Sequence, residues 1–254
     1  SEWGSGNVGG ESETIIGNWL KTRGGRDSVV IATKVAKLST RRGLSAKNLQ
    51  AACEDSLSRL QTDYIDLYYA HEDDPQTPLE ETLGAFDSLI QSGKVRYIAA
   101  SNFTAERFRE SLEVSRKNGF ATYVAAQDQF NLLERDYERT LQPTLVENSL
   151  SQLPYFGLAR GFLTGKYRPG KSVDSMRAGG MSSYQNERGW ALLSKMDNLA
   201  EKYQTTVSAI SLAWLRAQPS VAAPIASARN LEQLKEIMPV VALSTEALQT
   251  LTNA

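Results

Sequence analysis

The sequence predicts an α/β fold built on a parallel sheet. Short runs rich in β-branched and aromatic residues alternate with longer segments of helical period. The short runs are almost continuously apolar, which is typical of strands buried on both faces. With 41% hydrophobic residues in 254, the chain can bury roughly 70–75% of its unfolded surface, enough for one large α/β barrel or two ordinary domains.

Six stretches have the character of strands. Four are clear and two are weaker, and in chain order they are 29–34, 64–70, 95–100, 122–127, 153–155 and 221–226. A (β/α)8 or TIM barrel closes only with eight strands, because an open parallel sheet leaves unpaired backbone groups at its edges. We therefore expect a single barrel domain over residues 1–254 whose first two strands are absent from this sequence.

Capping residues and apolar stripes predict the helices between these strands. Thr77, followed by Pro78, is expected to cap a helix that ends at Gly93, and Ser12 is expected to cap the first helix. Apolar stripes mark the segments 13–20, 49–60, 108–112 and 207–214. Cys53 lies on one of these stripes and is expected in the core. The Gly- and Ser-rich segment 169–183 is expected to be a long surface loop.

The composition excludes several classes of partner. The 28 basic and 29 acidic residues nearly cancel, so no general attraction to nucleic acid or anionic membrane is expected. A single histidine rules out a multi-His metal centre, and the acidic run 72–74 is better explained as a solvated loop. The single cysteine fits a reducing cytoplasm, and no apolar stretch is long enough for a membrane span.

Polar residues follow the strands at their carboxyl ends, where parallel α/β folds gather their chemistry. These residues are Lys34, His71, Ser101, Asn102, Gln127, Tyr155, Ser227 and Arg229. Each alone has an ordinary structural explanation, but together they favour one site. Lys34 and His71 follow strands expected to be neighbours, so both could face one reacting carbonyl.

The segment from Arg229 to Gln233 has two interpretations. Arg229 and Asn230 open a short helix whose amino end suits an anion, and the arginine adds a charged fork. Asn230 with Gln233 is equally well explained as a capping box. The sequence leaves both open.

Seven motifs in order carry a resemblance to a known family. They lie at 9–14, 29–34, 57–71, 93–103, 126–135, 154–167 and 224–234, and include LSRLQTDYIDLYYAH, GKVRYIAASNF and PYFGLARGFLTGKY. Together they resemble the aldo-keto reductase superfamily, most closely its bacterial branch of NADP-dependent reductases. The likeness covers essentially the whole chain.

The resemblance implies a (β/α)8 barrel in which NADPH delivers a hydride to an aldehyde or ketone. Lys34 and His71 match the lysine and histidine of the family's catalytic tetrad, whereas its aspartate and tyrosine have no match in these 254 residues. We therefore expect the sequence alone to bind NADPH poorly and to reduce aldehydes slowly.

The resemblance also implies a set of cofactor contacts. Those expected at the carboxamide are Ser101, Asn102 and Gln127, with Tyr155 stacked on the nicotinamide. Those expected at the pyrophosphate are Leu158, Arg160, Gly161 and Lys166, and those at the 2′-phosphate and adenine are Ser227, Arg229 and Gln233. Ser227 departs from the glycine of many members, and Ile237 from an asparagine. Trp3 is expected beside the substrate.

Two other functions stay open. A barrel that binds NADP(H) without turnover could act as a regulatory or redox-sensing subunit, as channel-associated members of the family do. Lys34 could instead form a Schiff base in an aldolase-type barrel, which would need no cofactor. Neither the substrate nor the oligomeric state can be inferred from the sequence.

Overall fold

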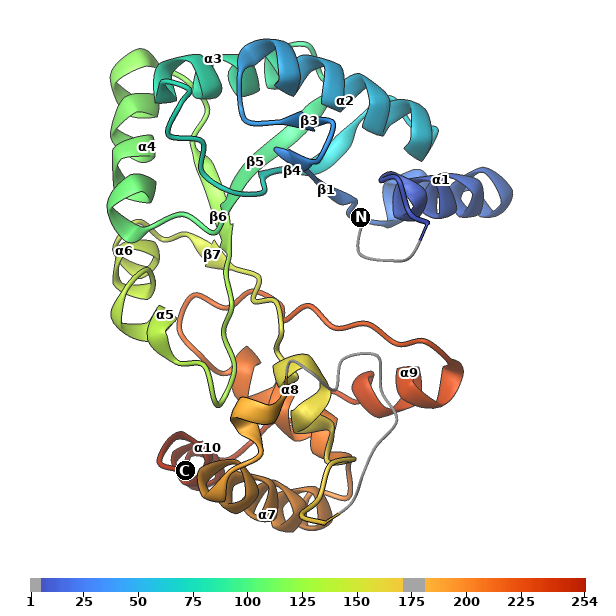
Figure 1. Ribbon diagram of the computed structural model, residues 1–254, viewed down its shortest axis with the longest axis vertical. Helices are drawn as coiled ribbons and strands as arrows, with labels where there is room; N and C mark the ends of the chain where they lie inside the picture. The colour runs from blue at the N-terminus through green and yellow to red at the C-terminus, as the bar shows by residue number, and fades with distance from the viewer. Residues whose placement is uncertain (1–5, 171–180) are drawn as a thin grey trace. The chain divides into compact units, whose positions relative to one another are not determined.

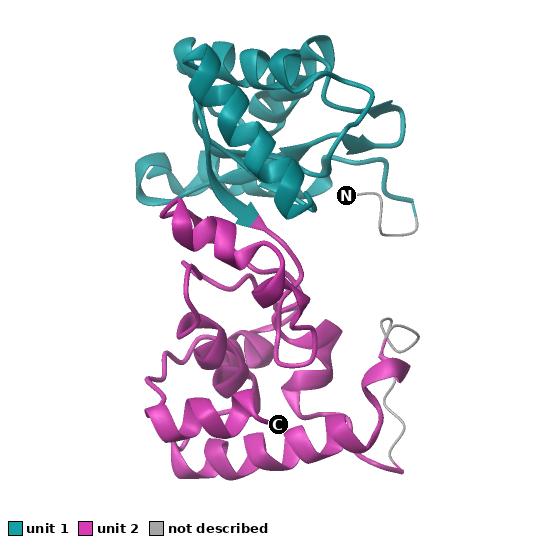
Figure 2. Ribbon diagram, turned by 90° about the vertical axis from the view of Figure 1, so that its left-hand side faces the viewer, with its two compact units in different colours: residues 1–126 teal, residues 127–254 magenta. Residues whose placement is uncertain are grey.

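A computed structural model describes residues 6–170 and 181–254 (Figure 1). The chain forms two compact units, residues 1–126 and 127–254, each described here by itself (Figure 2). Trp3 and most of the expected loop 169–183 lie outside the described residues.

Unit 1 is built on a sheet with strands in the order β1-β4-β5-β6. These strands are β1 (Ala32–Val35), β4 (Ile65–Ala70), β5 (Val95–Ser101) and β6 (Tyr123–Gln127). The β1–β4 and β4–β5 pairs are parallel, and Lys34 lies opposite Tyr69. The carboxyl ends of neighbouring strands therefore meet at one edge, as the sequence predicts.

Four helices connect and flank these strands (Figure 1). They are α1 (Glu11–Arg23), α2 (Ala46–Leu60), α3 (Leu79–Gln91) and α4 (Ala105–Asn118). Each helix packs against the next in this order. A short helix η1 (Arg26–Ser28) precedes β1, and an antiparallel hairpin of β2 (Lys37–Leu38) and β3 (Arg41–Arg42) follows it.

Aromatic side chains form the centre of the unit 1 core. Tyr123 makes ring contacts with Phe86, Phe103 and Phe108 at centroid distances of 6.2, 5.9 and 5.8 Å, and Tyr68 contacts Phe86 at 5.8 Å. Three of these four pairs meet edge to face, the arrangement that ring quadrupoles favour. The core thus joins β4, β6, α3 and α4.

Two expected helix caps are wrong. Helix α1 begins at Glu11, so Ser12 lies inside it, and the Glu11 carboxylate instead accepts hydrogen bonds from the amides of Val8 and Gly9. Helix α3 begins at Leu79, and the Thr77 hydroxyl donates to Asp74 at 2.7 Å rather than capping the helix. At Thr77 the Asp74 carboxylate engages the hydroxyl that the capping pattern assigned to the helix amides.

Unit 2 is mostly helical. Its elements are α5 (Asp136–Arg139), α6 (Gln142–Glu147), β7 (Ser151–Gln152), η2 (Ala159–Thr164), η4 (Ser182–Tyr184), α7 (Glu187–Lys202), α8 (Val207–Arg216), α9 (Leu231–Ile237) and α10 (Thr245–Thr252). Helix α8 is the centre of the unit, with Trp214 fully buried against Phe130 at 5.4 Å. Helix α7 packs against α8 and α10.

The two weaker strand predictions correspond to single bridges. In the predicted segment 153–155 only Tyr155 forms a bridge, to Gln129, and in 221–226 only Val221 does, to Gln152. Each segment contains a proline, Pro154 or Pro224, which has no amide hydrogen to donate to a ladder. The short strand β7 lies just before the first of these prolines.

Candidate functional site

Four of the expected site residues lie at the carboxyl ends of three adjacent strands in unit 1. Lys34 is on β1, His71 follows β4, and Ser101 and Asn102 stand at the end of β5. The His71 amide donates to Val35 at 3.0 Å. The Asn102 side-chain amide donates to the His71 carbonyl and to the Ser101 hydroxyl, both at 2.9 Å. Hydrogen bonds thus hold the three strand ends together.

The electrostatics of this edge favour an uncharged histidine beside a lysine. Burial, followed by the positive charges of Lys34 and Lys37, lowers the pKa of His71 to about 4. Burial also lowers the pKa of Lys34, whose ammonium lies 5.3 Å from the centre of the Tyr69 ring. At neutral pH this edge offers an imidazole N–H donor next to a partly desolvated cation.

Asn102 has an unusual backbone. Its φ of 58° lies in the left-handed region, which disfavours most side chains and is best tolerated by glycine, asparagine and aspartate. The conformation accompanies two hydrogen bonds of the side chain, one to His71 at the neighbouring strand end and one to Ser101 of the same strand.

The acidic run 72–74 is a structural loop. Glu72 pairs with Lys37 at 3.1 Å and Asp73 with Arg107 at 3.0 Å. Asp74 accepts from the Leu44 amide at 2.8 Å. Because each carboxylate has a protein partner, the run agrees with the loop interpretation rather than with a cation site.

In unit 2 a cavity of about 630 Å³ collects the other expected cofactor residues. Eight of them line it: Tyr155, Leu158, Arg160, Gly161, Lys166, Ser227, Arg229 and Gln233. Gln127 is the remaining expected cofactor residue of unit 2. It is the last residue of β6 and is buried. Two segments about sixty residues apart in sequence thus meet in one cavity, which no single motif predicts.

The cavity wall between Phe156 and Lys166 has a strained backbone. Phe156, Ala159 and Arg160 adopt φ values of 54°, 46° and 57°, and Gly161 adopts 102°. Three consecutive left-handed residues turn the chain tightly around the cavity. The Arg160 guanidinium stacks on Phe156 at 4.5 Å, and both residues line the cavity. Strain of this kind persists where the surroundings fix it and is concentrated at functional sites.

The segment Arg229–Gln233 forms the capping arrangement. The Asn230 side chain accepts from the Gln233 amide at 2.9 Å, and the Gln233 side chain accepts from the Arg229 amide at 3.0 Å. The Arg229 side chain is exposed and lines the cavity. The cap therefore accounts for the backbone of this segment, and the guanidinium is the group that an anion would meet.

The sequence analysis missed Ser208 as a cavity residue. It is the second residue of α8, it is 1% exposed, and it lines the cavity. The detectable signal was a serine in the first turn of a mostly apolar helix, which the apolar stripe predicts to be buried. Thr164, Gly165 and Glu236 line the cavity as well.

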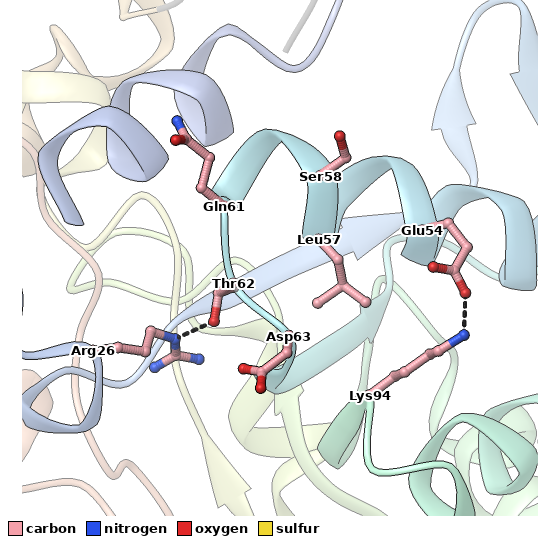
Figure 3. Close-up of a pocket in the computed structure, with 8 residues that line it drawn as sticks. All are labelled: Arg26, Glu54, Leu57, Ser58, Gln61, Thr62, Asp63 and Lys94. Atoms are coloured by element: carbon pink, nitrogen blue, oxygen red, sulfur yellow. Dashed lines mark hydrogen bonds and ion pairs between the residues drawn. The ribbon is translucent and has the colours of Figure 1, made fainter. Parts of the chain in front are cut away.

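A second cavity, of about 790 Å³, lies in unit 1 at the opposite ends of the strands from His71 (Figure 3). Three of its charged groups already have partners: Lys94 forms an ion pair with Glu54, and Arg26 donates to Thr62 at 3.0 Å (Figure 3). Arg26 also pairs with Asp66 at 2.7 Å. We assign this cavity no ligand.

Comparison with known proteins decides the family. A family model described as the aldo/keto reductase family matches residues 7–254. The chain belongs to the aldo/keto reductase family. It is 34% identical to an uncharacterised oxidoreductase, YrpG, of Bacillus subtilis over 96% of this chain and 77% of that protein. It is 32% identical to a putative voltage-gated potassium channel subunit beta of Schizosaccharomyces pombe, over 91% and 72%.

A solved member of the family shares the fold. The structure of a thermostable aldo-keto reductase in complex with the inhibitor epalrestat matches with a TM-score of 0.77 and 29% identity, over 95% of this chain and 77% of that one. The α/β barrel class predicted from the sequence is confirmed. Membership also gives the chain an oxidoreductase role, in a family whose members generally bind NAD(P)(H).

Proposed function

We propose that the protein is an NADPH-dependent reductase of aldehydes or ketones, with a small-molecule carbonyl substrate. The observation that supports this most directly is the convergence of the eight expected cofactor residues on one cavity of unit 2.

The residues of this cavity suit a phosphorylated dinucleotide. Arg160, Lys166 and Arg229 bring three cations to its lining, against one carboxylate, Glu236. Tyr155 contributes an aromatic ring of the kind that stacks on a nicotinamide. In this proposal Arg160 and Lys166 hold the pyrophosphate, and Arg229 holds the 2′-phosphate that distinguishes NADPH from NADH.

Lys34 and His71 have separate roles in the proposed reaction. The neutral His71 imidazole donates a hydrogen bond that orients the substrate carbonyl. The Lys34 ammonium stabilises the negative charge that develops on the carbonyl oxygen, and burial strengthens this effect. The cofactor supplies the hydride when bound. The family's aspartate and tyrosine remain without a match, so no proton donor is assigned.

A binding experiment tests the cofactor. Replacing Arg229 with Gln removes the charged fork, so we expect NADPH affinity to fall about 10- to 100-fold while NADH affinity changes less than about 3-fold. Titration of the cofactor's fluorescence measures both. Lys235→Gln is the control, because Lys235 lies on α9, the helix that follows Arg229, but outside the cavity lining.

An equal loss for NADPH and NADH would contradict the 2′-phosphate role of Arg229. No measurable NADPH binding by the unaltered chain would contradict the proposed cofactor itself.

A kinetic experiment tests the reaction. We expect Lys34→Met to lower the rate of aldehyde-dependent NADPH oxidation on the order of 10²-fold or more, because the cation next to the carbonyl is lost. Absorbance at the nicotinamide band measures the rate, and NADPH affinity checks that the variant still folds. A rate within about 2-fold of the unaltered protein would exclude this role for Lys34.

A second function is favoured by one comparison, the relative named as a putative potassium channel subunit beta. In that case the chain would bind NADP(H) and act as a regulatory subunit without turnover. The two functions differ in one outcome: NADPH binding with no oxidation across a panel of aldehydes and ketones would favour the regulatory one.

A further inference from the structure

We infer that Ser208 is a ligand-binding residue, whose hydroxyl and the first turn of α8 bind a phosphate oxygen of the dinucleotide at the base of the unit 2 cavity. This rests on the cofactor proposed above and adds a contact that the sequence resemblance does not assign.

The first observation is an unpartnered hydroxyl. Ser208 is 1% exposed, and its oxygen is buried without a hydrogen-bond partner among the described residues. A buried hydroxyl that forms no hydrogen bond destabilises a protein, so such groups are rare unless a water or ligand satisfies them. Because Ser208 lines the cavity, a bound ligand can provide the missing acceptor.

The second observation is the position of Ser208 on the helix. Helix α8 is 10 residues long, and Ser208 is its second residue. The amides of a first helical turn have no acceptor within the helix, and their partial positive charge attracts anions. Thr206 caps only the third of these amides, that of Ala209, at 3.0 Å.

The third observation is the loop that lies over this helix end. Gly165 packs so closely on Val207 that an added Cβ would come within 3.2 Å of it. The same loop contributes Lys166 to the cavity lining, so a cation, a helix amino end and a free hydroxyl belong to one cavity. All three groups can donate a hydrogen bond to an anionic oxygen.

The matched comparison is Ser111, a serine of helix α4 in unit 1. It is also fully buried, but its hydroxyl donates to the Arg107 carbonyl at 2.8 Å. Replacing each serine with alanine therefore removes a satisfied hydroxyl in one case and an unsatisfied hydroxyl in the other.

The two variants should behave in opposite ways. Without ligand, Ser208→Ala should leave the melting temperature unchanged or raise it, whereas Ser111→Ala should lower it by roughly 2–4 °C. With NADPH, Ser208→Ala should bind roughly 10- to 100-fold more weakly, and Ser111→Ala should bind as the unaltered chain does. Thermal melts and fluorescence titration give both readouts. Competition by adenosine 2′-monophosphate, which has the 2′-phosphate but neither phosphate of the pyrophosphate, tests whether the contact is to the pyrophosphate.

Assignment of the contact to the pyrophosphate requires that Ser208→Ala binds adenosine 2′-monophosphate as the unaltered chain does. Equal NADPH affinity of Ser208→Ala and the unaltered chain would overturn the assignment while leaving the proposed cofactor intact. If the unaltered chain binds no NADPH, both are overturned. A lower melting temperature of ligand-free Ser208→Ala would show that the hydroxyl is structural and would also overturn the assignment.

Discussion

His71 carries the clearest electrostatic signal of any single residue in the proposed site. Its backbone is held at both sides, through its amide to Val35 and through its carbonyl to Asn102. Burial and two nearby lysines favour the neutral imidazole. The sequence could place this histidine at a strand end, but it could not give its charge state, which depends on the desolvation that packing creates.

We expect the imidazole of His71 to titrate with a midpoint of about 4 instead of the usual 6.5. NMR of the histidine ring measures this directly, because the chain has only one histidine. Lys34→Met should raise the midpoint, since it removes one of the positive charges. A midpoint at or above 6.5 would contradict the burial that the structure gives this side chain.

The same shift has a consequence for stability. The pKa is lowered in the folded state, so between about pH 4 and 6.5 the unfolded chain binds a proton that the folded chain does not. This group therefore makes the free energy of unfolding rise with pH through that window. Replacing His71 with Gln should make the stability less dependent on pH there, as urea unfolding at pH 5 and 7 would show.

At the scale of elements, helix packing depends on a glycine in α1. A Cβ at Gly17 would lie 2.2 Å from the carbonyl oxygen of Arg59 in α2, a distance that no relaxation of a side chain can relieve. The two helices therefore approach with backbone against backbone. The sequence shows only a glycine within a helical pattern, and its role appears once the partner helix is placed.

We expect Gly17→Ala to lower the free energy of unfolding by about 1–3 kcal/mol, although alanine is ordinarily the better helix former. Gly84→Ala in α3 is the control, because its Cβ would meet only the Phe120 ring at 3.4 Å or more. That change should be neutral or stabilising by up to about 1 kcal/mol. Urea denaturation compares them, and a stabilised Gly17→Ala would refute the close approach.

Local signals predicted some elements better than others. Strands β4, β5 and β6 agree with the sequence to within one residue, because buried apolar runs are strong local signals. Strand β1 begins three residues later than expected, since the Ile31 amide bonds to the Asp66 side chain. Tertiary contacts of this kind have no local signature.

At the scale of the whole molecule, we propose that residues 1–254 fold as one domain. Domain boundaries normally fall in exposed linkers. Here the division between the two units falls inside strand β6, between the buried residues Ala126 and Gln127. Among the helices in the described ranges, none combines the length and apolar character needed to cross a membrane.

A single domain should unfold in one transition. Trp3 and Trp19 belong to unit 1, and Trp190 and Trp214 belong to unit 2. The double variants Trp3→Phe/Trp19→Phe and Trp190→Phe/Trp214→Phe each keep tryptophans in one unit, so their fluorescence reports on different parts of the chain. For each variant, we expect the urea midpoint from tryptophan fluorescence to coincide with the midpoint from far-UV circular dichroism of the same variant. Separate midpoints for the two units would contradict the single-domain proposal.

The left-handed backbone of Asn102 limits which amino acids this position can accept. Glycine would keep the conformation but lose both side-chain hydrogen bonds, whereas leucine or valine would suit neither requirement. A survey of all substitutions at this position would therefore separate backbone preference from side-chain function. If glycine alone is tolerated, the requirement at this position is the left-handed backbone. If every replacement is rejected, the requirement is the side-chain amide and its hydrogen bonds.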